Sequence, residues 1–281
     1  MKQDLEYSPT LHVLLYPVSR SFASIVKFRK NHTTKHIPYY SRFFDKLPSV
    51  AKMRAGAKGW KGVEAIYSWE QPRGLAGRLE NFWMTARNCQ ALRNRLRIVI
   101  KVLRAHIEQL RKQGVTSIHI LSLAAGSGKS VLTAAANSDD IVITSIDSDE
   151  SAGAASKKLA QELNVQNITW HHGDVFDLHI LPKGYKADIV EIIGLHEYLT
   201  DEQSIRLCKS LLPYMKSDGV LVTSQTHKNP ESAIVTQIVD WEMIYRSPKE
   251  FTSLLESAGF TQTTLHTEPH AIQSVAFSSI K

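Results

Sequence analysis

Cysteine is scarce in this sequence, with only Cys89 and Cys208 among 281 residues. Two cysteines offer neither a disulfide framework nor a metal-ligand set. The adjacent His171 and His172 do not supply one, because neighbouring residues on a strand face opposite ways and no third ligand is suitably spaced. We therefore expect no metal site.

Long apolar runs are also lacking. The longest fall well short of the roughly 20 residues that a membrane-spanning helix needs. Near the start, a short apolar run follows Asp4 and Glu6 and is broken by Pro17, which does not fit a signal peptide. With 43% hydrophobic and 22% charged residues, the composition is typical of a soluble globular protein. We expect a cytoplasmic protein without membrane partners.

The charge is unevenly distributed. Residues 1–115 hold 22 Lys and Arg against 7 Asp and Glu, whereas residues 116–281 hold 12 against 20. The net charges of +15 and −8 place a boundary near 111–117. The basic part either meets an anionic partner, such as nucleic acid, or docks its helices on the acidic part. Because its arginines are scattered, we favour docking.

The sequence pattern predicts a helix at the end of the basic part. Residues 1–85 show no sustained period and predict short helices and loops, whereas apolar residues recur at three- and four-residue steps over 81–114. Gly114 is placed to cap that helix. We therefore expect a helical N-terminal cap over 1–114 and a second domain over 115–281.

The second domain alternates strands with helices. Strand candidates at 117–124, 140–147, 167–174, 187–194 and 219–225 are separated by helix candidates at 129–136, 150–163 and 201–215. A capped helix at 247–260 and two strands, 261–268 and 271–279, complete the pattern. This order predicts an α/β fold with a doubly wound, mostly parallel seven-stranded sheet and an edge hairpin.

The turn after the first strand, in "LSLAAGSGKS", ends like a triphosphate-binding loop. That loop requires a glycine five residues before Gly128, and the residue there is Leu123, inside the strand. The turn from Ala125 to Gly128 is too short to wrap a triphosphate. It suits close backbone approach by a smaller ligand.

Acids follow the next two strands. Asp147 ends the second strand 21 residues after Gly126, a spacing that suits hydrogen bonds to ribose hydroxyls. Asp174 ends the third, where it can hold an exocyclic amine. In parallel sheets, ligands bind at these carboxyl ends, where strand order reverses. The pattern therefore fits a nucleoside.

Residues 115–281 resemble the class I S-adenosylmethionine (SAM)-dependent methyltransferases, which are Rossmann-like. Gly126 and Gly128 match the second and third glycines of that family's turn, and Asp147 and Asp174 match its ribose and adenine acids. The resemblance implies SAM as cofactor. Its expected binding residues are Ala124, Ala125, Gly126, Ser127, Gly128, Asp147, Ser148, Gly173, Asp174, Val175 and Gly194.

Two positions depart from the family pattern. Ala124 replaces the first glycine, where a methyl group often fits. Ser122 replaces an acid that helps to hold the amino group of the methionine moiety in the family. We expect another residue to supply that contact.

The loop "GLHEYL" follows the fourth strand and holds the catalytic candidates His196, Glu197 and Tyr198. His196 or Glu197 could take a proton from a nucleophile, Glu197 could bind a cationic substrate, and Tyr198 could orient the methyl group. The alternative is that this loop only packs and starts the next helix.

Substrate-binding candidates come from two other segments. Arg73, Arg78 and Trp83 lie in a stretch rich in arginine and aromatic residues that could form a lid. Tyr245 lies four residues after Trp241 on an expected helix and could line the pocket. Core packing is the alternative for each.

We predict a methyltransferase that acts on a small molecule. The rivals are an enzyme that transfers or cyclises the aminocarboxypropyl arm of SAM and releases methylthioadenosine, and a non-catalytic SAM- or nucleotide-binding partner. A nucleic-acid substrate is disfavoured because no [DN]-P-P-[YF] motif follows the fourth strand. A homodimer is an open alternative.

Overall fold

The computed structural model describes residues 4–7, 12–32, 47–57, 59–70, 73–237 and 239–280. Its contacts divide the chain into two compact units. Unit 1 comprises residues 1–94, 228–243 and 269–272, and unit 2 comprises 95–227, 244–268 and 273–281. This division falls inside helix α6 (Arg87–Lys112). The expected domain limits at residues 114 and 115 stay a prediction.

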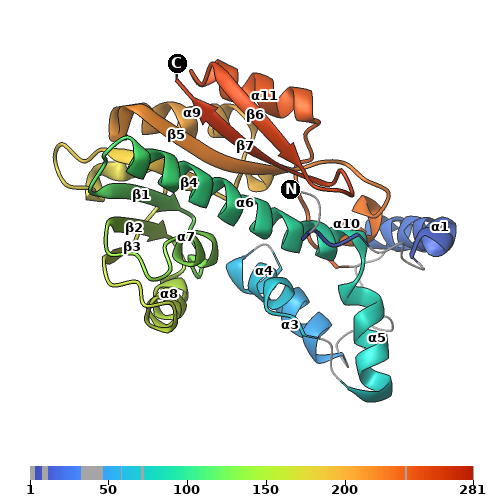
Figure 1. Ribbon diagram of the computed structural model, residues 1–281. Coiled ribbons are helices and arrows are strands. Elements are labelled where there is room, and N and C mark those ends of the chain that lie inside the picture. Colours follow the sequence, from blue (N-terminus) through green and yellow to red (C-terminus); the bar gives the residue numbers. More distant parts are fainter. Residues whose placement is uncertain are drawn as a thin grey trace. The chain divides into compact units, whose positions relative to one another are not determined.

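Unit 2 contains a seven-stranded sheet with the order β3-β2-β1-β4-β5-β7-β6, as Figure 1 shows. The strands are β1 (Ile118–Leu123), β2 (Ile141–Asp147), β3 (Ile168–His172), β4 (Ala187–Ile192), β5 (Met215–Thr226), β6 (Gln262–Thr267) and β7 (Gln273–Ser279). The first five pair in parallel, and β7 and β6 extend the sheet as an antiparallel pair. The predicted α/β sheet and edge hairpin are confirmed.

Helices and short 3-10 turns connect these strands. They are α7 (Lys129–Ala134), α8 (Glu150–Glu162), η1 (Leu178–Ile180), η2 (His196–Tyr198), α9 (Asp201–Leu211), η3 (Leu212–Tyr214) and α11 (Pro248–Ser257). The chain passes from β1 outwards to β3 and then returns to the other side of β1 as β4. Strand order therefore reverses between β1 and β4, the point at which ligands bind in such sheets.

Both faces of the sheet are covered. Ala276 on β7 belongs to the core that α9 and α11 help to form, whereas the neighbouring Phe277 packs edge-to-face on His106 of α6, with ring centroids 5.2 Å apart. Adjacent strand residues face opposite ways, so α6 lies over the other face (Figure 1). Strands β1 and β4 are buried along almost their whole length, which explains why they read as uninterrupted apolar runs.

Unit 1 is helical in its described part, as expected. It contains α1 (His12–His32), α3 (Pro48–Ala55), α4 (Trp60–Tyr67), α5 (Gly74–Met84), α10 (Ser232–Gln237) and the start of α6. Glu231 accepts hydrogen bonds from the backbone N–H groups of Arg87 and Asn88, at 3.1 and 2.9 Å, and so caps α6. The segment 33–46 lies outside the described residues.

The helix expected around Trp241 and Tyr245 is wrong. Helix α10 ends at Gln237, Asp240 adopts a φ of +63°, and residues 240–247 contain no helical turn. Within unit 2, Ile244 instead bonds through its N–H to the Glu197 carbonyl at 2.7 Å and through its carbonyl to Gln225 Nε2 at 3.0 Å. These non-local bonds replace those of a helix.

None of the helices in the described ranges combines the length and apolar character needed to cross a membrane.

Candidate functional site

The turn between β1 and α7 is tight. Ala124, Gly126 and Gly128 all have positive φ angles, of 49°, 53° and 68°. A Cβ on Gly128 would lie 3.2 Å from Leu132 Cδ1 and 3.3 Å from Ser156 Oγ, so both the backbone angle and the packing favour glycine there. The tight turn at the carboxyl end of β1 therefore depends on glycine at position 128.

Asp147 joins this turn to the end of β2. Its side chain is 8% exposed. Oδ2 accepts a hydrogen bond from the Gly126 N–H at 2.7 Å, and Oδ1 accepts one from the Asp149 N–H at 2.8 Å. A carboxylate oxygen can accept two hydrogen bonds, so each keeps capacity for a ligand hydroxyl. The predicted pairing of turn and acid is present.

The end of β3 adjoins that of β2. The Gly173 N–H donates to the Asp147 carbonyl at 3.0 Å. Asp174 is exposed and accepts a hydrogen bond from the Phe176 N–H at 2.9 Å, while Val175 is buried. Ser148 is exposed beside them. The segments 124–128, 147–148 and 173–175 therefore follow three neighbouring strands at one edge of the sheet.

Glu191 on β4 was missed by the sequence analysis. It pairs in register with Ser122 of β1. Ser122 Oγ donates to Glu191 Oε2, and Ser130 Oγ donates to Oε1, both at 2.6 Å. Burial raises the pKa of the Glu191 carboxyl above its ordinary value, and the two serine hydroxyls and the charge of Arg95 only partly offset this rise. The acid that the family pattern places at 122 is thus found on the neighbouring strand.

Gly194 begins the loop after β4 with a φ of +78°. A Cβ there would lie 3.3 Å from Arg95 Nη1. Arg95 is 3% exposed, and its Nη1 lies 3.8 Å from Glu197 Oε1. Arg95 of α6 therefore reaches the carboxyl end of β4, where the sequence alone showed no cation.

His196, the first catalytic candidate, lies in the interior of unit 2. The side chain is fully buried, its Nε2 lies 4.0 Å from Cys208 Sγ, and its ring packs edge-to-face on Phe251. Burial, helped by the charge of Arg246, lowers the pKa of His196 to about 3. The ring therefore packs in the core against α9 and α11. The catalytic role of His196 stays a prediction.

Glu197 and Tyr198 complete η2. Glu197 is 2% exposed, and its Oε1 accepts a hydrogen bond from Thr226 Oγ1 at 2.8 Å. Within the described part of the chain, its Oε2 has no hydrogen-bond partner. Tyr198 is partly exposed. Of the three predicted catalytic residues, Glu197 has an unsatisfied acceptor next to a cation.

Arg246 holds this loop in place. Its Nη1 donates to the His196 carbonyl at 2.7 Å and to Gln225 Oε1 at 3.0 Å. Its Nη2 donates to the Leu199 carbonyl at 2.6 Å, and Nε donates to Asp201 at 2.7 Å. One buried guanidinium therefore ties η2 to the end of β5.

The remaining substrate candidates lie on both units. Arg73 and Arg78 are exposed, and Trp83 is partly exposed and packs edge-to-face on Phe82, all in unit 1. Tyr245 in unit 2 is partly buried, and its hydroxyl has no hydrogen-bond partner among the described residues. The substrate-binding roles of these four residues stay predictions.

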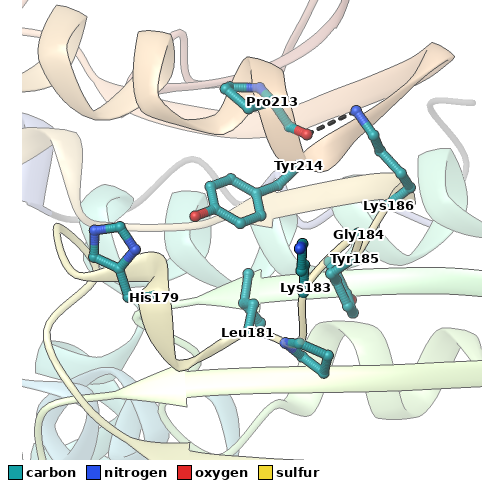
Figure 2. Close-up of a pocket in the computed structure, with 9 residues that line it drawn as sticks. His179, Leu181, Lys183, Gly184, Tyr185, Lys186, Pro213 and Tyr214 are labelled. Atoms are coloured by element: carbon teal, nitrogen blue, oxygen red, sulfur yellow. Dashed lines mark hydrogen bonds between the residues drawn. The ribbon is translucent and has the colours of Figure 1, made fainter.

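A surface pocket of about 460 Å³ lies elsewhere in unit 2 (Figure 2). Its lining residues are His179, Leu181, Pro182, Lys183, Gly184, Tyr185, Lys186, Pro213 and Tyr214. They precede β4 and β5, so the pocket opens at the amino ends of these strands, and Lys186 Nζ donates to the Pro213 carbonyl at 2.7 Å. It is separate from the edge that carries Asp147.

The strand order, the turn after β1 and the acids after β2 and β3 define an α/β methyltransferase fold of the class I, Rossmann-like type. A family model described as "Putative methyltransferase" matches residues 53–279. The chain belongs to this methyltransferase family.

Individual relatives are more distant. The "Uncharacterized protein YnbC" of Escherichia coli (strain K12) is 23% identical over 248 residues, which cover 80% of this chain and 41% of that protein. The chain thus spans about two fifths of the length of this curated relative.

Two crystal structures share the fold. A protein from Bordetella parapertussis, described as a possible exported protein, superposes with a TM-score of 0.69 at 16% identity, covering 97% of this chain and 99% of that one. The magnesium protoporphyrin IX methyltransferase of Synechocystis PCC 6803, with bound S-adenosylhomocysteine (SAH), has a TM-score of 0.57 at 13% identity, covering 85% and 97%.

Proposed function

We propose that this protein uses SAM to methylate a small molecule. The observation that carries the proposal is the bond from the Gly126 N–H to Asp147 Oδ2 at the carboxyl end of the sheet. It joins a close-approach turn to a ribose-type acceptor at the point where strand order reverses. Membership of a methyltransferase family supports the reaction class. The Synechocystis methyltransferase, crystallised with SAH, supports the cofactor.

Residues at the strand ends would hold the cofactor. Ala124, Ala125, Gly126, Ser127 and Gly128 would lie against its methionine end through the backbone, and Asp147 with Ser148 would accept the ribose hydroxyls. Gly173, Asp174 and Val175 would border the adenine, and Gly194 would border the reacting end. When bound, SAM supplies a methyl group that is already activated on a sulfonium. The chain then needs to position the acceptor and exclude water.

Glu191 would supply the contact that Ser122 cannot. Its carboxylate lies beside Ser122, and two serine hydroxyls bond to it. Each oxygen keeps capacity to accept a further bond, which suits the ammonium of the methionine moiety. The rival function, chemistry on the aminocarboxypropyl arm, was suggested because Ser122 stands where the family has an acid. An acid at the same level of the sheet therefore favours methyl transfer.

Glu197 is the residue of η2 that we place at the acceptor, with Tyr198 beside it. A carboxylate with an unsatisfied oxygen can accept the proton that a nucleophile loses as it is methylated. We propose that Arg73, Arg78 and Trp83 belong to a lid and that Tyr245 contributes to acceptor binding.

Calorimetric titration with SAM, SAH, methylthioadenosine and ATP tests the proposal. We expect micromolar binding of SAM and SAH that Asp147→Ala abolishes. The matched control is Asp139→Ala, an exposed residue just before β2, at the opposite edge. Binding of ATP alone, or SAM binding that survives Asp147→Ala, would contradict it. Mass spectrometry of a turnover reaction then separates the rivals, because methyl transfer releases SAH and arm chemistry releases methylthioadenosine.

We further propose a cytoplasmic protein without nucleic-acid or membrane partners. Cys89 and Cys208 are both buried free thiols, which suits a reducing compartment. Cell fractionation tests the location, and light scattering distinguishes a monomer from the homodimer that stays an alternative.

A further inference from the structure

Two buried side chains of unit 2 each leave one acceptor oxygen without a partner. Glu197 and Gln273 are both 2% exposed. Within the described ranges, neither Glu197 Oε2 nor Gln273 Oε1 has a hydrogen-bond partner. Buried polar atoms are rarely left in this state, and two such oxygens on side chains that bond to the same hydroxyl point to a ligand that donates hydrogen bonds.

One hydroxyl brings the two side chains together. Thr226 Oγ1 donates to Glu197 Oε1 at 2.8 Å and accepts from Gln273 Nε2 at 2.7 Å. Because Thr226 has a single hydroxyl proton and an ionised carboxylate can only accept it, Gln273 must present its NH₂ group to Thr226. The amide oxygen of Gln273 is therefore the atom left over, and it shares a neighbour with Glu197.

The rest of each residue is held in place. The Glu197 carbonyl accepts a bond from the Ile244 N–H at 2.7 Å, and the Gln273 N–H donates to Glu268 Oε1 at 3.3 Å. Thr226 ends β5, Gln273 begins the antiparallel β7, and Glu197 follows β4. All three lie on the side of the sheet at which the parallel strands end and which carries Asp147. The proposed function needs the methyl acceptor to bind on this side.

The charges narrow the ligand class. Both unsatisfied atoms are acceptors and one is a carboxylate oxygen, so an anionic ligand group is disfavoured. A hydroxyl has one proton to offer, whereas an amino group offers two or three from a single atom and can bridge both oxygens. Arg95 Nη1, 3.8 Å from Glu197 Oε1, offsets the carboxylate charge, so the amino group need not be cationic.

We infer that the methyl acceptor carries an amino group that binds between Glu197 Oε2 and Gln273 Oε1, a contact held by Thr226. This inference rests on the proposed function and names the chemical class of its acceptor. Glu197 and Gln273 are substrate-binding residues in this assignment, and Thr226 is a positioning residue.

The test uses the full chain loaded with SAH and four aromatic probes: benzylamine, aniline, benzyl alcohol and benzoate. Saturation-transfer NMR titrations give a dissociation constant for each. We expect the two amines to bind about tenfold more tightly than the alcohol and the acid, a factor equivalent to about 1.4 kcal/mol. Glu197→Gln turns an amide towards the amine and should abolish this preference. Gln273→Leu should reduce it.

Glu256→Gln, an exposed change on α11, is the matched control and should keep the preference. Calorimetry with SAH on each variant separates the possible failures. Loss of SAH binding by the wild-type chain would contradict the proposed function. Normal SAH binding with equal affinity for all four probes, or an amine preference that survives Glu197→Gln, would overturn only the amino-group assignment. Tighter binding of benzyl alcohol would replace the amine by a hydroxyl ligand.

Discussion

Ser122 Oγ and Glu191 Oε2 lie 2.6 Å apart on neighbouring parallel strands, so an acid from β4 occupies the level of β1 at which the family pattern has its own. We expect Glu191→Gln to weaken SAM and SAH binding by roughly ten- to a hundredfold, because a charge-assisted bond contributes roughly 1.5–3 kcal/mol. Methylthioadenosine lacks the amino acid arm and should bind unchanged. Calorimetry measures all three.

The exchange Ser122→Asp with Glu191→Ser provides the complementary experiment. It moves the acid back to β1 and should restore part of the SAM affinity. Equal weakening of SAM and methylthioadenosine by Glu191→Gln would instead show that the carboxylate only supports the fold.

His196 is expected to make stability depend on pH. Its pKa in the folded protein is about 3, against an ordinary value of 6.5. Protonation therefore favours the unfolded chain, and the wild-type protein should lose stability as the pH falls from about 6.5 towards 3, by at most ~1.4 kcal/mol per pH unit. Urea unfolding at several pH values measures the slope.

The variant His196→Leu removes the titrating group from this site. Its stability should vary less with pH over that interval, and methyl transfer should be retained if His196 is a core residue. Loss of turnover in a folded His196→Leu protein would return the histidine to the catalytic set.

Arg246→Met should be strongly destabilising. The change leaves the His196 and Leu199 carbonyls and Gln225 Oε1 without this donor, and removal of one partner from a buried charged network costs about 3–5 kcal/mol. Asp201→Asn is the control, since Asp201 is 74% exposed and its ion pair should contribute little. Chemical denaturation midpoints compare the two. Similar losses would show that the ion pair, and not the buried bonds, holds η2.

Gly194→Ala separates backbone strain from crowding. Gly194 and Gly184 have similar φ angles, +78° and +80°, but a Cβ on Gly184 meets nothing within 4 Å. Both alanine variants should be less stable by about 1–2 kcal/mol, because alanine is strained in the left-handed backbone region. Gly194→Ala should lose more, because Arg95 must move. Thermal melts of the two variants measure the extra loss of stability in Gly194→Ala. Identical melting temperatures would show that Arg95 moves aside without cost.

The order and spacing of elements along the chain were enough to predict much of the fold and the proposed cofactor site. Gly126 lies in the turn after β1 and Asp147 ends β2 of the same β-α-β unit, so their spacing predicted their meeting. Glu191 could not be placed in this way, because its partner Ser122 is 69 residues away and the register between β1 and β4 is not encoded locally. A glutamate inside the apolar stretch "ADIVEIIG" was the available signal.

Two other expectations depended on contacts that periodicity does not reveal. The spacing of Trp241 and Tyr245 indicated a helix, but bonds from Glu197 and Gln225 hold Ile244 in a non-helical segment. His196 read as a loop residue, yet Cys208 and Phe251 of two later helices enclose its ring. Thr226 and Gln273, which lie 47 residues apart, meet only through the pairing of β5 and β7.

Strand β7 follows β6 in the chain but lies between β5 and β6 in the sheet. Strand β6 reaches the sheet only through β7, and β7 must find β5 across the gap from Val220 to Ser279. The parallel strands can assemble first, through more local crossovers. Until the hairpin docks, the long β5 is an unprotected edge, so completing this side is expected to be the slow and aggregation-prone step of folding.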